Sequence, residues 1–85
     1  MNSEQKRKAY KVTITGNFDY EAYLRMSGLL NKFGNVRSTF FDEKSKTRPA
    51  AATFWVSILH DADDLKTVLE QTSGVHLVTT EANDA

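Results

Sequence analysis

The sequence contains no cysteine among its 85 residues, and only one proline and four glycines. The lack of cysteine excludes disulfides, thiolate metal sites and cysteine nucleophiles. No run of 18 apolar residues occurs, and the polar first eight residues lack the apolar segment of a secretion signal. We therefore interpret the chain as a cytoplasmic protein that does not insert into a membrane.

An excess of charge of one sign is also missing. Eleven Lys+Arg residues balance eleven Asp+Glu residues, which gives a formal net charge of zero at pH 7. Sequence-independent binding of nucleic acid requires a basic surface, so the composition argues against nucleic acid as a partner. With 40% hydrophobic residues, a chain of this length can form one small core, so we expect a single domain.

Patterns typical of catalysis are scarce. The two histidines, His60 and His76, stand at opposite ends of a predicted helix, and no serine or carboxylate lies at a spacing typical of a triad. Helix capping explains the acidic run that ends at Asp64 better than a metal site does. Gly16 to Asp19 lacks the arginine and the second glycine of an acylphosphatase phosphate loop. We therefore expect no enzyme activity, no catalytic residues, no metal and no cofactor.

The order of strand and helix patterns predicts the fold. Alternating hydrophobicity predicts strands over 10–15, 36–41, 50–58 and 75–81, and helical spacing of apolar residues predicts helices over 20–33 and 62–73. The order βαββαβ is typical of an α+β, ferredoxin-like two-layer sandwich with a four-stranded antiparallel sheet and both helices on one face. We expect this domain over 9–82, a disordered polar tail over 1–8 and a flexible tail over 83–85. Gly28, inside the first helix, predicts close approach of a neighbouring element.

The sheet face turned away from the helices is predicted to be rich in hydroxyl groups. Strict alternation assigns to it Lys11, Thr13, Thr15, Arg37, Thr39, Phe41, Thr53, Trp55, Ser57, His76, Val78 and Thr80. Two exposed aromatic rings among threonines favour a covering partner. Small two-layer domains often dimerise through the open face or through edge strands, so we expect a homodimer. The expected interface residues are Phe41, Trp55, Thr13 and Thr53.

RNA binding through this open face is an alternative. RNA-recognition modules share the element order and stack bases on aromatic residues of the central strands. The strand over 50–58 offers one outward aromatic residue, Trp55, and lacks the basic-glycine-aromatic signature of those modules. Binding through Trp55 and Phe41 is therefore less favoured than self-association.

The segment Arg25 to Ser38 resembles ACT domains, which are ligand-sensing regulatory modules, and in particular the regulatory small subunits of acetolactate synthase. Those subunits carry a helix of the pattern R-hydrophobic-x-G-L-hydrophobic, which leads to a glycine and then to N-[IV]-x-S. The matching residues here, with one residue fewer between glycine and asparagine, are Arg25, Met26, Gly28, Leu29, Leu30, Gly34, Asn35, Val36 and Ser38.

The resemblance implies an amino-acid effector at a dimer interface, between the first strand-helix loop of one chain and the start of the second strand of the other. The residues it assigns to ligand binding are Asn17, Phe18, Asp19, Asn35 and Val36. Free N–H groups at a helix start attract a carboxylate, which supports the loop assignment. Turn formation explains Asn17 and Asn35 equally well. The family's loop usually contains glycine, whereas here Asp19 and Glu21 would repel an anion.

We therefore expect a non-catalytic regulatory ACT-like domain. It would dimerise and bind a small metabolite such as an amino acid, or a partner enzyme such as an acetolactate synthase-type catalytic subunit, or both. The alternative is a protein-interaction module without a small-molecule ligand, whose open face docks on another protein.

Overall fold

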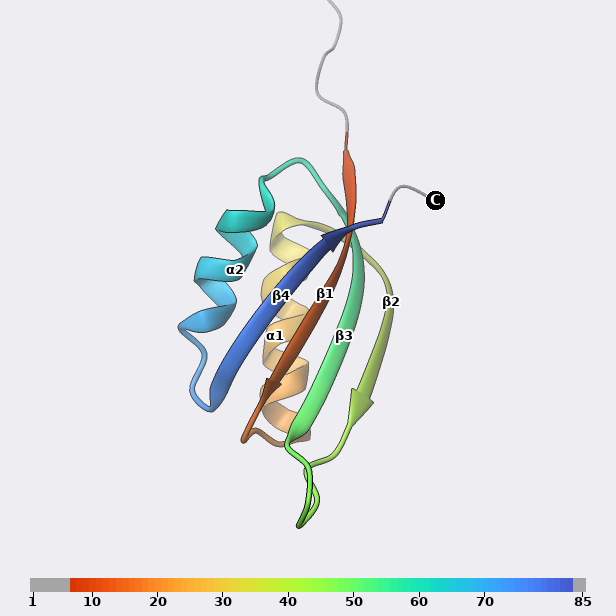
Figure 1. Cartoon of the computed structure of the whole chain (residues 1–85). Coiled ribbons are helices and arrows are strands. Elements are labelled where there is room, and N and C mark those ends of the chain that lie inside the picture. The colour runs from red at the N-terminus through yellow and green to blue at the C-terminus, as the bar shows by residue number, and fades with distance from the viewer. Residues whose placement is uncertain (1–6, 84–85) are drawn as a thin grey trace, which may run out of the picture.

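The computed structural model describes residues 7–83. The elements are β1 Lys8–Gly16, α1 Tyr20–Phe33, β2 Gly34–Asp42, β3 Ala50–Ile58, α2 Ala62–Glu70 and β4 Val75–Ala82. The sheet order is β2-β3-β1-β4, and every neighbouring pair is antiparallel. Both helices lie on one face of the sheet (Figure 1). The predicted ferredoxin-like βαββαβ sandwich is confirmed. Most of the two expected tails, residues 1–6 and 84–85, lies outside the described residues.

The helix α1 begins and ends at residues with clear local roles. Asp19 is the N-cap, and its carboxylate accepts a hydrogen bond of 3.0 Å from the Ala22 N–H. At the other end, the Gly34 N–H donates to the Leu30 carbonyl. A Cβ at Gly34 would lie 2.5 Å from the carbonyl oxygen of Ser57, so glycine is needed where the helix turns directly into β2.

Gly28 has no such neighbour. It is exposed, and apart from its own helix backbone and chain neighbours nothing lies within 4 Å of the place that its Cβ would occupy. The expected close approach at Gly28 is therefore wrong, because the residue faces away from the sheet. The close approach is made six residues later, at Gly34.

The helix α2 packs beside α1 on the same face of the sheet and connects β3 to β4 (Figure 1). Asp61 occupies its N-cap position without a side-chain capping bond, and its carboxylate instead lies 3.5 Å from the Lys8 ammonium. Leu65 and Leu69 are buried against the sheet. Gly74, with φ of +89°, turns the chain into β4, a conformation that favours glycine. Within residues 7–83, neither helix is long and apolar enough to cross a membrane.

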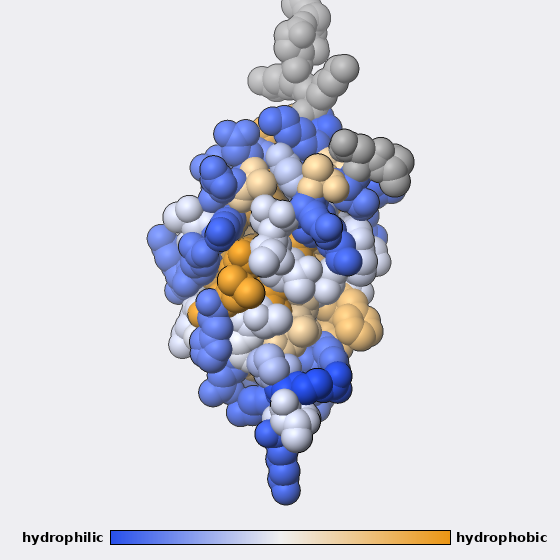
Figure 2. Space-filling model, viewed as in Figure 1, coloured by the Kyte–Doolittle hydropathy of each residue, from blue (hydrophilic) through white to orange (hydrophobic). Residues whose placement is uncertain are grey.

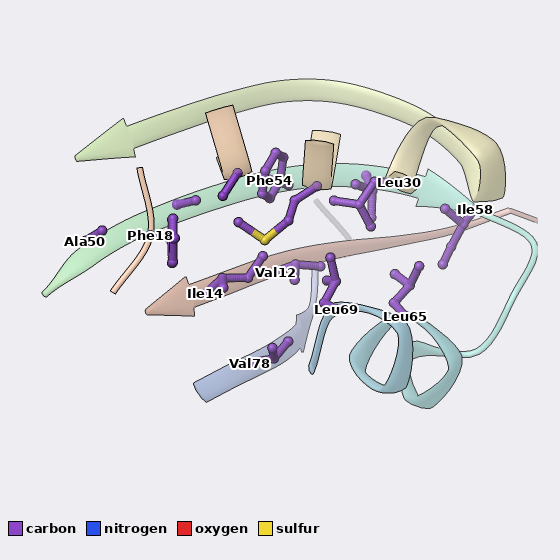
Figure 3. Packing of buried hydrophobic residues seen from close by; sticks show 14 residues of the cluster. Val12, Ile14, Phe18, Leu30, Ala50, Phe54, Ile58, Leu65, Leu69 and Val78 are labelled. Atoms are coloured by element: carbon purple, nitrogen blue, oxygen red, sulfur yellow. The ribbon is translucent and has the colours of Figure 1, made fainter. Parts of the chain in front are cut away.

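The core lies between the sheet and the two helices. Figure 3 shows side chains of both central strands, β4 and both helices pointing into one shared interior. Its largest fully buried residues are Phe54, Ile14, Met26, Leu30, Ile58, Leu65 and Leu69. The described part of the chain buries no polar or charged side chain, so hydrophobic burial is the main favourable term in its folding.

A β-bulge in β2 changes which face its later residues occupy. The register with β3 shifts between Val36 and Ser38, which leaves Arg37 as an extra residue. Beyond the bulge, Phe40 pairs with an open-face residue of β3 and Phe41 pairs with a helix-face residue. The expected position of Phe41 on the open face is wrong, because one inserted residue reverses the alternation of the rest of the strand.

A second irregularity has the same effect in β4. The register with β1 shifts next to His76, so Val75 packs against the core and Leu77 lies on the open face. Val78 is therefore fully buried beneath the helices. Both irregular strands are the outer strands of the sheet, where bulges are common. The residues expected on the open face that lie on the helix face are Thr39, Phe41, Val78 and Thr80.

Candidate ligand-binding site

A cleft of about 640 Å³ lies where α1 begins. Its walls come from the β1–α1 loop, the first turns of α1, the end of β2, the β2–β3 loop and the α2–β4 loop. The three loop residues that the ACT resemblance assigns to ligand binding, Asn17, Phe18 and Asp19, all line it. These three residues are therefore brought together around one cleft.

The β1–α1 loop is fixed by contact with the α2–β4 loop. The Asn17 N–H donates to the Gly74 carbonyl oxygen at 2.8 Å. A Cβ at Gly16 would lie only 2.1 Å from that same oxygen, so the two loops can pack this closely only through glycine. Phe18 is 7% exposed and belongs to the hydrophobic core. Phe18 therefore anchors the loop and forms the apolar base of the cleft.

The polar groups of the loop already have partners within the chain. The Asn17 side-chain oxygen accepts a hydrogen bond of 2.8 Å from the Lys44 ammonium. Asp19 caps α1, with one carboxylate oxygen bonded to the Ala22 N–H. The Asn17 amide nitrogen and the second Asp19 oxygen remain as groups that can meet a ligand.

Two cationic residues of the cleft, Arg25 and Lys44, were missed by sequence reasoning. Arg25 follows Ala22 by three residues, so helical spacing could have found it once Ala22 was placed at the cleft. Lys44 comes from the β2–β3 loop, 27 residues from its partner Asn17, and no local signal marks it. With Asp19 and Glu43, the cleft is lined by two cationic and two anionic side chains.

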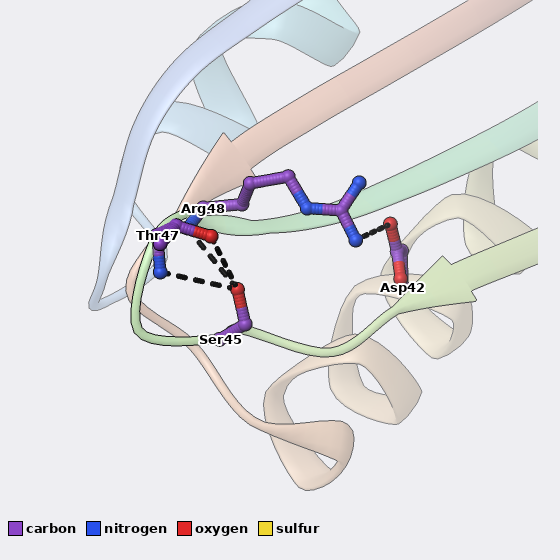
Figure 4. Close-up of polar contacts among 4 residues, drawn as sticks. All are labelled: Asp42, Ser45, Thr47 and Arg48. Atoms are coloured by element: carbon purple, nitrogen blue, oxygen red, sulfur yellow. Dashed lines mark hydrogen bonds and ion pairs between the residues drawn. The ribbon is translucent and has the colours of Figure 1, made fainter.

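The loop that carries Lys44 is shaped by its own hydrogen bonds (Figure 4). The Ser45 hydroxyl accepts bonds from the backbone N–H groups of Thr47 and Arg48 at 3.3 and 3.2 Å. The Ser45 N–H donates to the Arg48 carbonyl at 3.0 Å, and the Arg48 guanidinium lies 3.9 Å from Asp42. The loop therefore closes on itself next to the cleft.

Aromatic rings form the apolar wall of the cleft. The ring centroid of Phe41 lies 5.0 Å from that of Tyr23, 5.7 Å from that of Tyr20 and 6.2 Å from that of Phe18. Tyr23 also stacks on Phe54 at 5.5 Å, which connects the wall to the core. Phe41, expected at an open-face interface, instead contributes to this wall because of the β2 bulge.

Asn35 and Val36 lie far from the cleft within one chain. Both are at the start of β2, and Asn35 pairs with Ser57, whereas the β1–α1 loop follows Gly16 at the opposite end of the sheet. Val36 is half-buried against the core. Asn35 lines a second cleft of about 580 Å³. A single chain therefore does not bring Asn35 and Val36 together with the loop.

The open face holds three of the four expected interface residues, Thr13, Thr53 and Trp55. Trp55 is partly covered, and the Lys11 ammonium lies 5.9 Å from its ring centroid. Phe40 takes the place expected for Phe41 and is 58% exposed. The aromatic pair expected for RNA binding, Trp55 and Phe41, is therefore wrong in its second residue, because Phe41 faces the helices and Phe40 supplies the second ring of the open face.

Other chemistry-bearing residues do not gather into a site. Within residues 7–83, no three His, Asp or Glu side chains are placed to hold a metal ion. The His60 ring packs edge-on against Phe33, with centroids 4.9 Å apart. This contact gives His60 a packing role.

No model of a known protein family matches the sequence, and no curated protein matches it. Solved structures do match. The ACT domain from GTP pyrophosphokinase of Chlorobium tepidum aligns with a TM-score of 0.68 at 18% identity, over 88% of this chain and 99% of that one. An uncharacterized protein from Thermotoga maritima gives 0.64 at 22% identity, over 91% and 98% of the two chains.

The C-terminal domain of the MgtC protein from Mycobacterium tuberculosis also aligns, with a TM-score of 0.64 at 13% identity over 99% of this chain and 95% of that one. Identities this low establish the fold and not the function. The resemblance to acetolactate synthase small subunits stays a prediction. The fold of the chain is that of ACT domains.

Proposed function

We propose that this chain is a non-catalytic regulatory ACT-like domain that binds a small zwitterionic metabolite, such as an amino acid, in the cleft at the start of α1. The observation that carries the proposal is the balance of charges around an apolar wall. Arg25 and Lys44 line the same cleft as Asp19 and Glu43. A carboxylate and an ammonium on one small ligand match such a pair of opposite charges.

Each part of an amino acid has a suitable group in the cleft. Arg25 and Lys44, together with the positive end of the α1 dipole, attract a carboxylate. Asp19 and Glu43 attract an ammonium. The Phe41 ring offers an apolar surface to a side chain. The two cations offset the repulsion that the carboxylates of the loop were expected to exert on an anionic group.

A second copy of the chain would add Asn35 and Val36 to the cleft. Among residues 7–83, no strand pairs with the outer edge of β2, so the backbone groups of this edge can pair with a strand of a second copy. Antiparallel pairing of β2 with β2 of a second copy would place the start of that strand beside the end of this one, where Phe41 lines the cleft. This arrangement supports a shared site as in the family resemblance.

The output of the domain would be regulation of a partner enzyme, for which an acetolactate synthase-type catalytic subunit is the candidate. A bound effector shifts the equilibrium between two arrangements of a complex only if it binds one of them more tightly. The structural similarity to a domain of GTP pyrophosphokinase supports a role beside a catalytic unit.

Thermal unfolding in the presence of each of the common amino acids tests the proposal. A ligand at about 100 times its Kd stabilises the folded state by about 2.7 kcal/mol, and we expect one or a few amino acids to give a saturable rise in Tm. Arg25→Met and Lys44→Met should abolish the rise. Lys66→Met, an exposed position of α2 away from the cleft, is the matched control and should keep it.

A flat response of the unaltered protein across the amino-acid panel would refute the metabolite site. The alternative, a protein-interaction module without a ligand, would then be preferred. An equal loss of response in Lys66→Met would show that the effect depends on overall charge and not on the cleft.

A further inference from the structure

The second cleft, of about 580 Å³, lies at the opposite end of α1 from the first and differs from it in charge. The last turn of α1 and the start of β2 line it, together with Arg7 before β1 and Leu59 after β3. Arg7 and Lys32 are its charged side chains, and no carboxylate of residues 7–83 lines it. The first cleft balances two cations with two anions, whereas the second is cationic.

The cations of this second cleft keep their capacity to bind a carboxylate. The ion pairs formed within residues 7–83 join other residues. One N–H group of the Arg7 guanidinium donates to the Ser57 carbonyl at 3.1 Å, which orients the guanidinium and leaves its other donors for a ligand. Lys32 lies in the last turn of α1, whose end carries only about half a negative charge. A net positive charge therefore remains in the cleft.

The two clefts lie at the two ends of β2, and both are formed against α1. Phe41 at the end of β2 lines the first cleft, and Asn35 at its start lines the second. Figure 2 shows hydrophilic surface at both ends of the molecule, over the β2–β3 loop at one end and around the start of β1 at the other. Polar groups of one chain are therefore gathered at both ends of the β2 edge.

Pairing of β2 with β2 of a second copy, as in the proposed function, brings unlike clefts together. A two-fold axis at Ser38, the middle of Gly34–Asp42, pairs the whole strand and places Asn35 of one copy opposite Phe41 of the other. Residues directly opposite each other in antiparallel strands have Cα atoms about 4.5–5.5 Å apart. The cationic cleft of each copy then adjoins the charge-balanced cleft of the other.

We propose that the amino acid bound in the shared site has an acidic side chain, whose carboxylate is bound by Arg7 and Lys32 of the second copy. The inference rests on the proposed function and deepens it, because it names the class of the metabolite. The first cleft holds the ammonium and the α-carboxylate as described above. The second copy supplies the cations for the additional carboxylate.

The charge of the joined site selects this class. Four cationic side chains, Arg25 and Lys44 of one copy with Arg7 and Lys32 of the other, stand against the two carboxylates of the first cleft, which gives a net charge of +2. An acidic amino acid carries a net negative charge at neutral pH, a neutral one carries none and a basic one is positive. Opposite charge attracts the first kind and like charge excludes the last.

Isothermal titration calorimetry of the full chain with aspartate, glutamate and their uncharged amides, asparagine and glutamine, tests the proposal. We expect one acidic amino acid to bind about tenfold or more tightly than its own amide, because only the acid makes the additional charge-assisted bonds. The double variant Arg7→Gln, Lys32→Gln should bind the acid and the amide equally well. Lys66→Gln, on the exposed side of α2 away from both clefts, is the matched control and should keep the preference.

The possible failures are distinguishable. Equal affinity of the unaltered protein for an acid and its amide would overturn the acidic class and leave the metabolite site in place. No binding of any amino acid would refute the proposed function itself. A preference that persists in the double variant would overturn the role of Arg7 and Lys32.

Mixed dimers test whether the additional carboxylate is bound by the second copy. One variant, Arg25→Met with Lys44→Met, keeps only the cationic cleft, and the double glutamine variant keeps only the charge-balanced cleft. Neither alone should prefer the acid. An equal mixture should recover tight acid binding in about one quarter of the sites, because half of the dimers are mixed and each has one complete site. No recovery in the mixture would overturn the shared arrangement.

Discussion

Alanine substitutions at two glycines of the first half, Gly28 and Gly34, are expected to change stability in opposite directions. At Gly28 a Cβ would meet nothing within 4 Å beyond the helix itself, and the position is exposed. The gain is then the difference in helix propensity, so Gly28→Ala should raise the free energy of unfolding by about 0.8–1 kcal/mol. For a domain of this size each kcal/mol corresponds to about 4–8 °C in Tm.

At Gly34 the same change is expected to destabilise. The added carbon would lie 2.5 Å from the Ser57 carbonyl oxygen and 2.9 Å from the Ile58 Cα, both backbone atoms of a central strand. Strand β2 would have to move away from β3, and overpacking of this kind costs about 1–3 kcal/mol.

Urea unfolding, followed by Trp55 emission and far-UV circular dichroism at low protein concentration, measures both effects. The slope of the free energy with urea should stay the same in both variants, since the buried surface changes little. A loss of stability in Gly28→Ala would refute the reasoning, because it would require a packing partner that the exposed position lacks. A neutral Gly34→Ala would refute the close approach between β2 and β3.

Three further changes test separate features. Asp19→Ala removes the α1 cap and should cost about 1 kcal/mol in urea unfolding, whereas Asp19→Asn should cost little; equal losses would contradict capping. Phe54→Ala should cost about 3–5 kcal/mol in the same assay, and a loss below about 1 kcal/mol would contradict its full burial. Phe41→Ser should destabilise the monomer far more than Phe40→Ser in calorimetry, because the bulge turns Phe41 toward the helices; the reverse order would place the bulge elsewhere.

The sequence was sufficient to predict the helices and strands, and to predict which residues of the two central strands face the helices. β1 and β3 alternate without interruption, so Val12 and Phe54 could be assigned to the helix side. The two outer strands were misread from the point where each contains an extra residue. Neither Arg37 nor His76 marks a bulge in the sequence, because the irregularity arises from pairing with a neighbouring strand.

The candidate site was predictable only in its local part. The resemblance to ACT domains assigns Asn17 to Asp19 to ligand binding, and the strand end, loop and helix cap that place this segment are signals along the chain. Arg25 could be assigned to the cleft only once the side of α1 that faces the cleft was known. Lys44 reaches the cleft from the β2–β3 loop, and the direction of that loop depends on how β2 and β3 pair. A local pattern of apolar and polar residues cannot predict which charged side chains from distant segments lie close together.

The bond between the Asn17 N–H and the Gly74 carbonyl joins the two βαβ halves at the rim of the cleft, and Ser73 from the second half lines that cleft as well. A molecule held there would touch both halves at once. Its binding energy would then oppose the partial opening in which β4 and the preceding loop detach, although most of its contacts lie elsewhere. Slower amide hydrogen exchange along β4 would show that a ligand bound in the cleft stabilises this edge strand against local unfolding.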